Sequence, residues 1–313
     1  MRAVWLREFG EPEVLVEGEA PDPVAAPGQV LVEVAFAAVH FIETQFRATG
    51  KGPYRGELPM IPGNGVGGVI SGLGEGVDPA LAGRPVVTAT GGSGGYAQRV
   101  AVDAAGVFDV PDGLALESAV ALLGDGRTAT GLVQATTVAA GDRVLVEAAA
   151  GGVGSLLVQL AKAAGAEVVG VAGGARKVAH VRELGADLAV DYRSPDWAAR
   201  VGEFDVVFDG VGGAIGTAAS RLVRPGGRMA IYGLSSGSWT EVSEEDFQAR
   251  GITLVRRIGG PAELRGFTES ALAEAAAGRL APVIGQTFAL ARAADAHAAI
   301  QSRDTLGRTL LTV

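Results

Sequence analysis

A run of three glycines near the middle of the chain gives the first chemical signal. The apolar stretch at residues 144–146 suits a buried strand, and residues 148–154 follow as Ala-Ala-Ala-Gly-Gly-Val-Gly, leading into a helical segment that stops at Gly165. A strand, a glycine turn and a helix in this order place backbone N–H groups and the positive end of the helix where a pyrophosphate can bind. The expected cradle is formed by Ala150, Gly151, Gly152, Val153 and Gly154.

The alternative is a glycine-rich turn in an unrelated α/β domain. A second strand at residues 167–172 favours the dinucleotide interpretation, because it completes a βαβ unit of the length that the fingerprint requires.

The end of this second strand indicates which dinucleotide would bind. Sites that prefer NAD place an Asp or Glu here to hold the ribose 2′-OH, whereas this chain has Gly173 and Gly174. Arg176 and Lys177 follow directly, and two cations at a glycine turn suit a 2′-phosphate. The alternative is a pair of solvated helix residues. We therefore expect NADPH, with Gly173, Arg176 and Lys177 at its adenosine phosphate.

Composition excludes several other chemistries. The 313-residue chain has no cysteine, which rules out disulfides, cysteine nucleophiles and thiolate zinc sites. Its three histidines, His40, His180 and His297, are far apart and lack ligand spacing. With a net charge of −9 and no block of Lys and Arg, we expect no nucleic-acid partner. Neither a signal-peptide layout nor a long apolar span is present, so we expect a cytoplasmic protein without a membrane partner.

The elements that must position these residues fall into two groups. Apolar stretches up to about residue 117 are separated by Pro and Gly, which predicts a β-rich domain. Its expected strands are residues 2–6, 14–17, 29–38, 63–70, 83–88 and 95–102, with a helical segment at 41–48. From residue 118, helices and strands alternate, which is typical of a doubly wound parallel sheet. The expected helices there are residues 118–123, 128–134, 175–184, 196–201 and 215–222.

The last fifty residues return to β character after an amphipathic helix at 263–279. Strands at 285–290 and 308–313 flank a helix at 292–302, and this tail is expected to rejoin the first domain. The predicted organisation is α/β, with a discontinuous catalytic domain at residues 1–118 and 265–313 and a Rossmann domain at residues 119–264.

Several short motifs occur in order along the whole chain. They include Phe41-Ile42-Glu43-Thr44, Ile61-Pro62-Gly63, Gly94-Gly95-Tyr96-Ala97, residues 148–154, Asp191-Tyr192-Arg193 and Pro225-Gly226-Gly227-Arg228. Together they resemble the medium-chain dehydrogenase/reductases, specifically the zinc-independent quinone oxidoreductase (zeta-crystallin-like) branch. The resemblance implies a GroES-like β domain plus a Rossmann domain, with the active site in the cleft between them and a homodimer as the assembly. Residues 252–258 are β-branched and could pair as an edge strand with a second copy.

The resemblance also implies roles for individual residues. It supports Lys177 at the 2′-phosphate, adds Tyr192 near it, and places Thr128 near the nicotinamide ribose. The remaining implied cofactor positions are Val211, Tyr232, Gly233 and Arg308. Tyr192 could equally be a half-buried core residue, and turn geometry alone would explain a glycine at position 233.

The chemistry of the acceptor site follows from what the chain lacks. Without a ligand set for a metal, the acceptor must be one whose reduced charge is delocalised, such as a quinone or an activated enone, and hydrogen-bond donors must supply the rest. His40, Thr44 and Arg47 are the expected catalytic residues, and the further candidate donors are Tyr54, Asn64 and Arg127. A structural role is the alternative for each, and Glu43 could serve only as a helix cap.

Two positions depart from the family pattern. Family members usually carry asparagine where this chain has His40 and glutamate where it has Gly65, while Asn64 stands at the position of a zinc-ligating histidine in metal-dependent relatives. The leading hypothesis is a metal-free, NADPH-dependent reductase of quinones or α,β-unsaturated carbonyl compounds, with a small-molecule substrate. One alternative is an enoyl-thioester reductase, for which Arg47, Lys51 and Arg55 form the local basic group. The other is a non-catalytic NADPH-binding protein.

Overall fold

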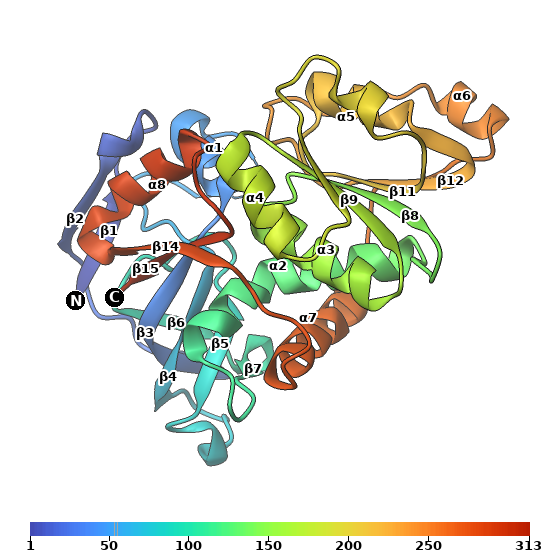
Figure 1. The fold of residues 1–313 in the computed structure, drawn as a ribbon. Helices are drawn as coiled ribbons and strands as arrows, with labels where there is room; N and C mark the ends of the chain where they lie inside the picture. Colours follow the sequence, from blue (N-terminus) through green and yellow to red (C-terminus); the bar gives the residue numbers. More distant parts are fainter. Residues whose placement is uncertain (53, 55) are drawn as a thin grey trace. The chain divides into compact units, whose positions relative to one another are not determined.

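The chain folds into two compact units, drawn in Figure 1 from a computed structural model that describes residues 1–52, 54 and 56–313. The first unit comprises residues 1–124 and 272–313, and the second comprises residues 125–271. Both ends of the chain therefore belong to the first unit. Arg55, one of the three basic residues considered for a thioester groove, lies outside the described residues.

The first unit is built on a seven-stranded sheet. Its strands follow the order β14 (Ile284–Ala289), β15 (Arg308–Thr312), β3 (Gln29–Val39), β4 (Gly65–Leu73), β5 (Pro85–Ala89) and β7 (Phe108–Asp109), and β6 (Arg99–Asp103) also pairs with β3. The antiparallel pairing of β15 with β3 sets Leu310 opposite Ala38, which returns the end of the chain to its amino-terminal unit. A separate pair, β1 (Arg2–Leu6) and β2 (Leu15–Glu19), completes the strands of this unit.

Alternating apolar residues produce the core of this unit. Val30, Val32 and Val34 recur at every second position of β3 and are buried, as a half-buried strand requires. They pack in one cluster with residues of α1 (Phe41–Thr49) and α8 (Ala293–Gln301), among them Phe46 and Ala296.

The second unit has a parallel six-stranded sheet. Its order is β10 (Leu188–Asp191), β9 (Glu167–Ala172), β8 (Arg143–Glu147), β11 (Phe204–Asp209), β12 (Val223–Ile231) and β13 (Thr253–Val255). Its connections carry α3 (Gly152–Ala163), α4 (Ala175–Glu183), α5 (Gly213–Ser220) and α6 (Glu244–Ala249), and α7 (Pro261–Ala276) follows β13. Numbered from β8, this is the Rossmann order 3-2-1-4-5-6, whose direction reverses between β8 and β11. Ligands of such sheets bind at that point, beyond the carboxyl ends of the strands.

Two helices differ from the sequence-based expectation. The segments expected as helices at 118–123 and 128–134 form one continuous helix, α2 (Leu116–Ala135). Gly124 and Gly126 weaken helix propensity, but the buried residues Ala119 to Leu123 and Leu132 stabilise the helix through tertiary packing. The helix expected at 196–201 is only a 3-10 turn, Trp197–Arg200. No helix among the described residues has the length and hydropathy needed to cross a membrane.

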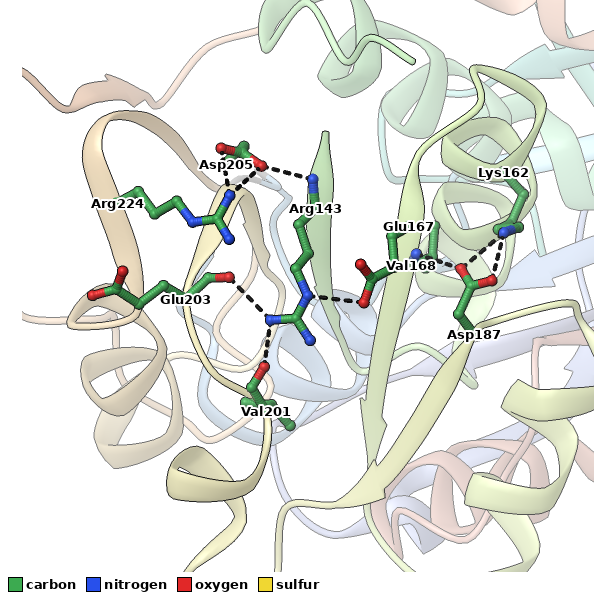
Figure 2. A network of polar contacts seen from close by, with 9 residues as sticks. All are labelled: Arg143, Lys162, Glu167, Val168, Asp187, Val201, Glu203, Asp205 and Arg224. Carbon is green, nitrogen blue, oxygen red and sulfur yellow. Dashed lines mark hydrogen bonds and ion pairs between the residues drawn. The ribbon is translucent and has the colours of Figure 1, made fainter. Parts of the chain in front are cut away.

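A polar network fastens the amino ends of the parallel strands (Figure 2). Arg143, the first residue of β8, donates to Glu167 of β9 at 2.9 Å and to the carbonyl oxygens of Val201 and Glu203 at 2.6 and 3.1 Å. Its backbone N–H donates to Asp205 of β11 at 2.8 Å, and that carboxylate also pairs with Arg224. This edge of the sheet therefore has a structural role, which leaves the opposite edge for ligands.

Candidate nucleotide site and hydride-acceptor residues

The glycine turn lies at the carboxyl end of β8, where it begins helix α3. Ala148 has a positive φ of 47°, and Gly151 is the N-cap of the helix. A Cβ at Gly154 would lie 2.9 Å from the Cα of Ala149 and would overlap the Ala148 carbonyl oxygen, so only glycine permits this close approach of helix and strand. That is the packing role of the third glycine in a dinucleotide turn, and the turn therefore fits the expected cofactor.

An acidic side chain faces the same turn. A Cβ at Gly152 would overlap the carboxylate of Asp125, which comes from α2 and is 6% exposed. The first N–H groups of α3, which carry the positive end of the helix dipole, lie at the same turn. Thr128 follows one turn later on α2, within the second unit.

The carboxyl end of β9 is enclosed by two residues that directly follow the neighbouring strand β10. A Cβ at Gly173 would lie 3.2 Å from the hydroxyl of Tyr192, and a Cβ at Gly174 would lie 2.6 Å from Nη2 of Arg193. Gly174 also has a φ of 100°, which side chains rarely adopt. Arg176 and Lys177 lie in the first turn of α4, directly beyond this glycine pair.

The sequence interpretation missed an acid at this place. Asp191, at the end of β10, pairs in parallel register with Ala172 of β9 and so reaches the glycine pair from the side. Arg193 binds its carboxylate through Nη2 at 3.0 Å and through Nε at 3.2 and 3.3 Å. The hydrogen bond from Arg193 is the main cause that lowers the pKa of Asp191 to about 2. The motif Asp191-Tyr192-Arg193 was visible in the sequence, but only the strand register places its side chains.

Two buried acids stabilise the turn at the end of β11. Oδ1 of Asp209 accepts hydrogen bonds from the N–H groups of Val211 and Gly212 at 3.0 and 2.7 Å, and Oδ2 accepts the hydroxyl of Thr240. Glu147, at the end of β8, also faces the N–H of Val211, at 3.3 Å. Burial, and then the charge of Asp209, raises the pKa of Glu147 well above its ordinary value. This raised pKa favours the protonated, uncharged form of the Glu147 carboxyl group.

Tyr232 and Gly233 follow β12 at the same edge. A Cβ at Gly210 would lie 2.5 Å from the Tyr232 hydroxyl, so the ring covers the turn after β11. A Cβ at Gly233 would lie 2.6 Å from the carbonyl oxygen of Gly210, which requires glycine for packing alone. Thus the second unit gathers most expected cofactor positions at one edge: the glycine turn with Ala150 and Val153, Gly173, Arg176, Lys177, Tyr192, Val211, Tyr232 and Gly233.

His40 lies in the first unit, as the N-cap of α1. Its N–H donates to Oε2 of Glu43 at 2.7 Å and its carbonyl accepts the N–H of Glu43 at 3.0 Å, so Glu43 does cap the helix. A Cβ at Gly65 would lie 3.4 Å from Cε1 of His40, and a Cβ at Gly124 would lie 3.2 Å from Nε2. The two glycines therefore leave room for the imidazole, whose side chain is 19% exposed.

Thr44 and Arg47 have structural surroundings. The Thr44 hydroxyl donates to the carbonyl of Phe41 at 2.7 Å. Arg47 is 1% exposed and donates to the carbonyl of Gly10 and, at 2.7 Å, to Gln301. Because these buried donors already serve the fold, the catalytic roles expected for Thr44 and Arg47 lose support.

The other expected residues of the first unit also have local partners. Arg308 donates to the carbonyl of Val39 at 3.1 Å, which anchors the backbone just before His40. Tyr54 packs edge-on against Phe46, with ring centroids 5.9 Å apart. The carbonyl of Asn64 accepts the N–H of Thr90 at 2.7 Å. Within residues 1–52, 54 and 56–313, no three acidic or histidine side chains gather in a way that could hold a metal ion.

Comparison with known protein families supports the assignment of both units. The family model of the alcohol dehydrogenase GroES-like domain matches residues 26–112, and that of the zinc-binding dehydrogenase matches residues 152–274. A probable quinone oxidoreductase of Schizosaccharomyces pombe is 34% identical, over 98% of this chain and 96% of its own. A 2-haloacrylate reductase of Burkholderia sp is 30% identical, over 99% and 98%.

Solved structures extend the agreement to three dimensions. The crystal structure of Escherichia coli quinone oxidoreductase complexed with NADPH superposes with a TM-score of 0.91 at 28% identity and covers all of both chains. These full-length matches, together with the Rossmann order and the GroES-like unit, establish the family. The chain belongs to the zinc-independent quinone oxidoreductase branch of the medium-chain dehydrogenase/reductase superfamily.

Proposed function

We propose that this protein is a metal-free reductase that uses NADPH to reduce quinones or α,β-unsaturated carbonyl compounds. The observation that carries the proposal is the end of β9. Two glycines there are followed by Arg176 and Lys177, and the neighbouring Asp191 is already paired with Arg193. Such a site favours a 2′-phosphate over a free 2′-OH. The E. coli structure is described as an NADPH complex, and the Burkholderia relative is named as a reductase of an unsaturated compound.

The residues of each unit have distinct tasks in this proposal. The nicotinamide supplies the hydride when bound. In the second unit, the turn at residues 150–154 holds the pyrophosphate, Lys177 and Tyr192 face the adenosine phosphate, and Thr128, Val211 and Gly233 line the nicotinamide end. In the first unit, His40 donates a hydrogen bond to the acceptor oxygen as negative charge develops there. Because that charge is delocalised in a quinone or an enone, this donor can replace a metal.

A spectrophotometric screen of NADPH consumption tests this function. We expect quinones or enones to be reduced, with NADPH preferred over NADH. Faster turnover of enoyl-CoA would favour the thioester reductase, and tight NADPH binding without turnover of any acceptor would favour a binding protein. His40→Ala should lower kcat about a hundred-fold, whereas His40→Asn retains a donor and much of the activity. His180→Asn, on α4, is the matched control and should leave kcat unchanged.

A homodimer is the assembly we propose. In the described part of the chain, strand β13 ends the parallel sheet with β12 as its one neighbour, and Leu254 and Val255 are half-buried. An open edge of this kind can pair with the same edge of a second copy. Light scattering at micromolar concentration should give the mass of two chains, and a monomeric mass would contradict the proposal.

A further inference from the structure

The carboxylate of Glu43 lies at the centre of a buried polar chain in the first unit. It is 3% exposed, and its Oε2 atom accepts the N–H of His40 at 2.7 Å and the hydroxyl of Tyr96 at 3.0 Å. The same oxygen lies 3.4 Å from Nδ1 of the His40 ring. Among the described residues, Nδ1 of His40 is one of the few buried polar atoms without a hydrogen-bond partner. Glu43 is therefore a group within reach that could satisfy it.

Glu43 is ionised in these surroundings. Burial by itself would raise the pKa of its carboxyl group, but the neighbouring His40, whose backbone N–H donates to it, holds that pKa below its ordinary value. A buried carboxylate is stable only where donors or cations face it. An N–H at Nδ1 of His40 would be such a donor.

The other groups around this chain do not take the place of His40. His297 of α8 lies 3.0 Å from the Tyr96 hydroxyl through Nε2, and burial lowers its pKa to about 4, so it is neutral near pH 7. Arg308 of β15 donates to Val39, and Arg47 of α1 donates to Gly10 and Gln301. Both cations thus donate to acceptors other than His40 and serve the fold locally.

We propose that Glu43 is a positioning residue that keeps Nδ1 of His40 protonated and thereby directs Nε2 to the substrate. The inference rests on the proposed function of His40. The acceptor carbon takes a hydride from the reduced nicotinamide, and the resulting enolate or phenolate takes the Nε2 proton of the imidazolium. Breaking that N–H bond leaves a neutral imidazole with its proton on Nδ1, held by Glu43. Solvent then returns one proton to Nε2, which restores the imidazolium for the next turnover.

A capping role alone predicts something different. A cap needs only an oxygen that accepts the His40 N–H, and the amide oxygen of Gln can supply one. The positioning role needs the negative charge opposite Nδ1. Glu43→Gln therefore separates the two roles while leaving the helix start intact. Tyr96→Phe is the matched control, because it removes a different partner of the same oxygen and leaves that charge in place.

Nitrogen-15 NMR of the histidine side chains measures the tautomer directly, without any turnover. The chain has three histidines, and His40→Asn identifies the signals of residue 40. We expect neutral His40 to carry its proton on Nδ1 in the wild type and in Tyr96→Phe, and to populate the Nε2–H form in Glu43→Gln. A wild type with the proton on Nε2, or an unchanged tautomer in Glu43→Gln, would overturn the inference.

Kinetics supply the second readout. In Glu43→Gln we expect kcat to fall about ten-fold or more with KM little changed, because the ring of His40 loses the partner that directs Nε2 to the substrate. Equal kcat values in Glu43→Gln and the wild type would contradict the inference. Should Glu43→Gln fold poorly, Glu43→Asp keeps the charge and should retain the wild-type tautomer. Failure of the wild type to reduce any acceptor would refute the proposed function instead, since the tautomer is measured independently.

Discussion

The imidazole of His40 lies against the α-carbon of Gly65, so that a Cβ added at Gly65 would lie 3.4 Å from Cε1 of the ring. The family resemblance leads us to expect asparagine and glutamate at these two positions, and they are neighbours in space. A Cβ at Gly65 would also lie 3.5 Å from Ala38 and from Leu123. The site therefore has room for a methyl group, but a longer side chain must displace the ring.

Substitutions at Gly65 test whether the missing side chain there makes room for the His40 ring. Gly65→Ala should leave kcat and the melting temperature nearly unchanged, whereas Gly65→Glu should lower kcat at least ten-fold by displacing His40. In the double variant His40→Asn/Gly65→Glu the smaller asparagine restores the space, so part of the activity should return. Steady-state kinetics of the wild type, His40→Asn, Gly65→Glu and the double variant measure the coupling between the two positions. Additive effects of the two changes would show that the positions are independent.

Removal of Lys177 should weaken NADPH selectively. A lost charge-assisted contact to the 2′-phosphate is worth about 1.5–3 kcal/mol, so Lys177→Ala should raise the KM for NADPH about ten- to a hundred-fold. The KM for NADH should change little. Lys162→Ala is the matched control, because that lysine pairs with Asp187 at the opposite edge of the sheet. Equal use of both cofactors by the wild type would refute the argument.

Arg193 should act on the same selectivity through Asp191. Without its partner, the carboxylate of Asp191 would face the nucleotide unneutralised, repel a 2′-phosphate and accept a hydrogen bond from a free 2′-OH. Arg193→Ala should therefore weaken NADPH binding and strengthen NADH binding, as measured by fluorescence titration. The double variant Arg193→Ala/Asp191→Asn removes both charges and should recover part of the NADPH affinity. If Arg193→Ala weakens the binding of NADPH and NADH equally, Asp191 lies too far from the nucleotide to influence the selectivity.

The parallel sheet of the second unit could be predicted from the sequence because its strands are short, apolar and regularly interrupted by glycine. The glycine pair at 173 and 174 likewise predicted where a nucleotide would bind. Single-sequence patterns do not report which strands are neighbours, so the approach of Asp191 and Arg193 to Gly174 could not be predicted. The same limit hid the chain from Glu43 through Tyr96 to His297, which joins residues distant in sequence.

Local composition also misled the sequence interpretation at two places. Gly124-Asp125-Gly126 reads as a break between helices, yet the buried residues on both sides keep α2 continuous. Arg47 reads as a cation available to substrate, yet the first unit buries it among carbonyl acceptors. In both cases tertiary packing overrides a local signal.

Acidic pH should destabilise the first unit through His297. Its pKa is about 4 in the folded protein and 6.5 when unperturbed, so the unfolded chain binds more protons between these values. Stability from this residue is therefore complete above about pH 6.5 and falls as the pH drops toward 4, by at most about 1.4 kcal/mol per pH unit. His297→Gln should show a flatter melting temperature across this range, with the same slope as the wild type between pH 7 and 8. If the melting temperatures of His297→Gln and the wild type fall in parallel across the whole pH range, the role assigned to His297 is wrong.

Metal removal should have no effect on activity. The chain has no cysteine, and the described residues contain no cluster of three metal-ligating side chains. We expect no stoichiometric zinc by elemental analysis, and unchanged NADPH oxidation after dialysis against a chelator. One zinc ion per chain would refute this prediction.

The network around Arg143 fastens only the amino ends of the parallel strands, whereas glycines predominate where those strands end. Local opening costs least where few side chains pack, so amide hydrogen exchange should be slow at the starts of β8 and β11 and faster in the turns after them. A dinucleotide that binds there would order the edge that opens first and would not disturb the edge that is already fastened. Nucleotide binding would then protect a local region of the unit, while Arg143 and its partners continue to determine the resistance of the whole unit to unfolding.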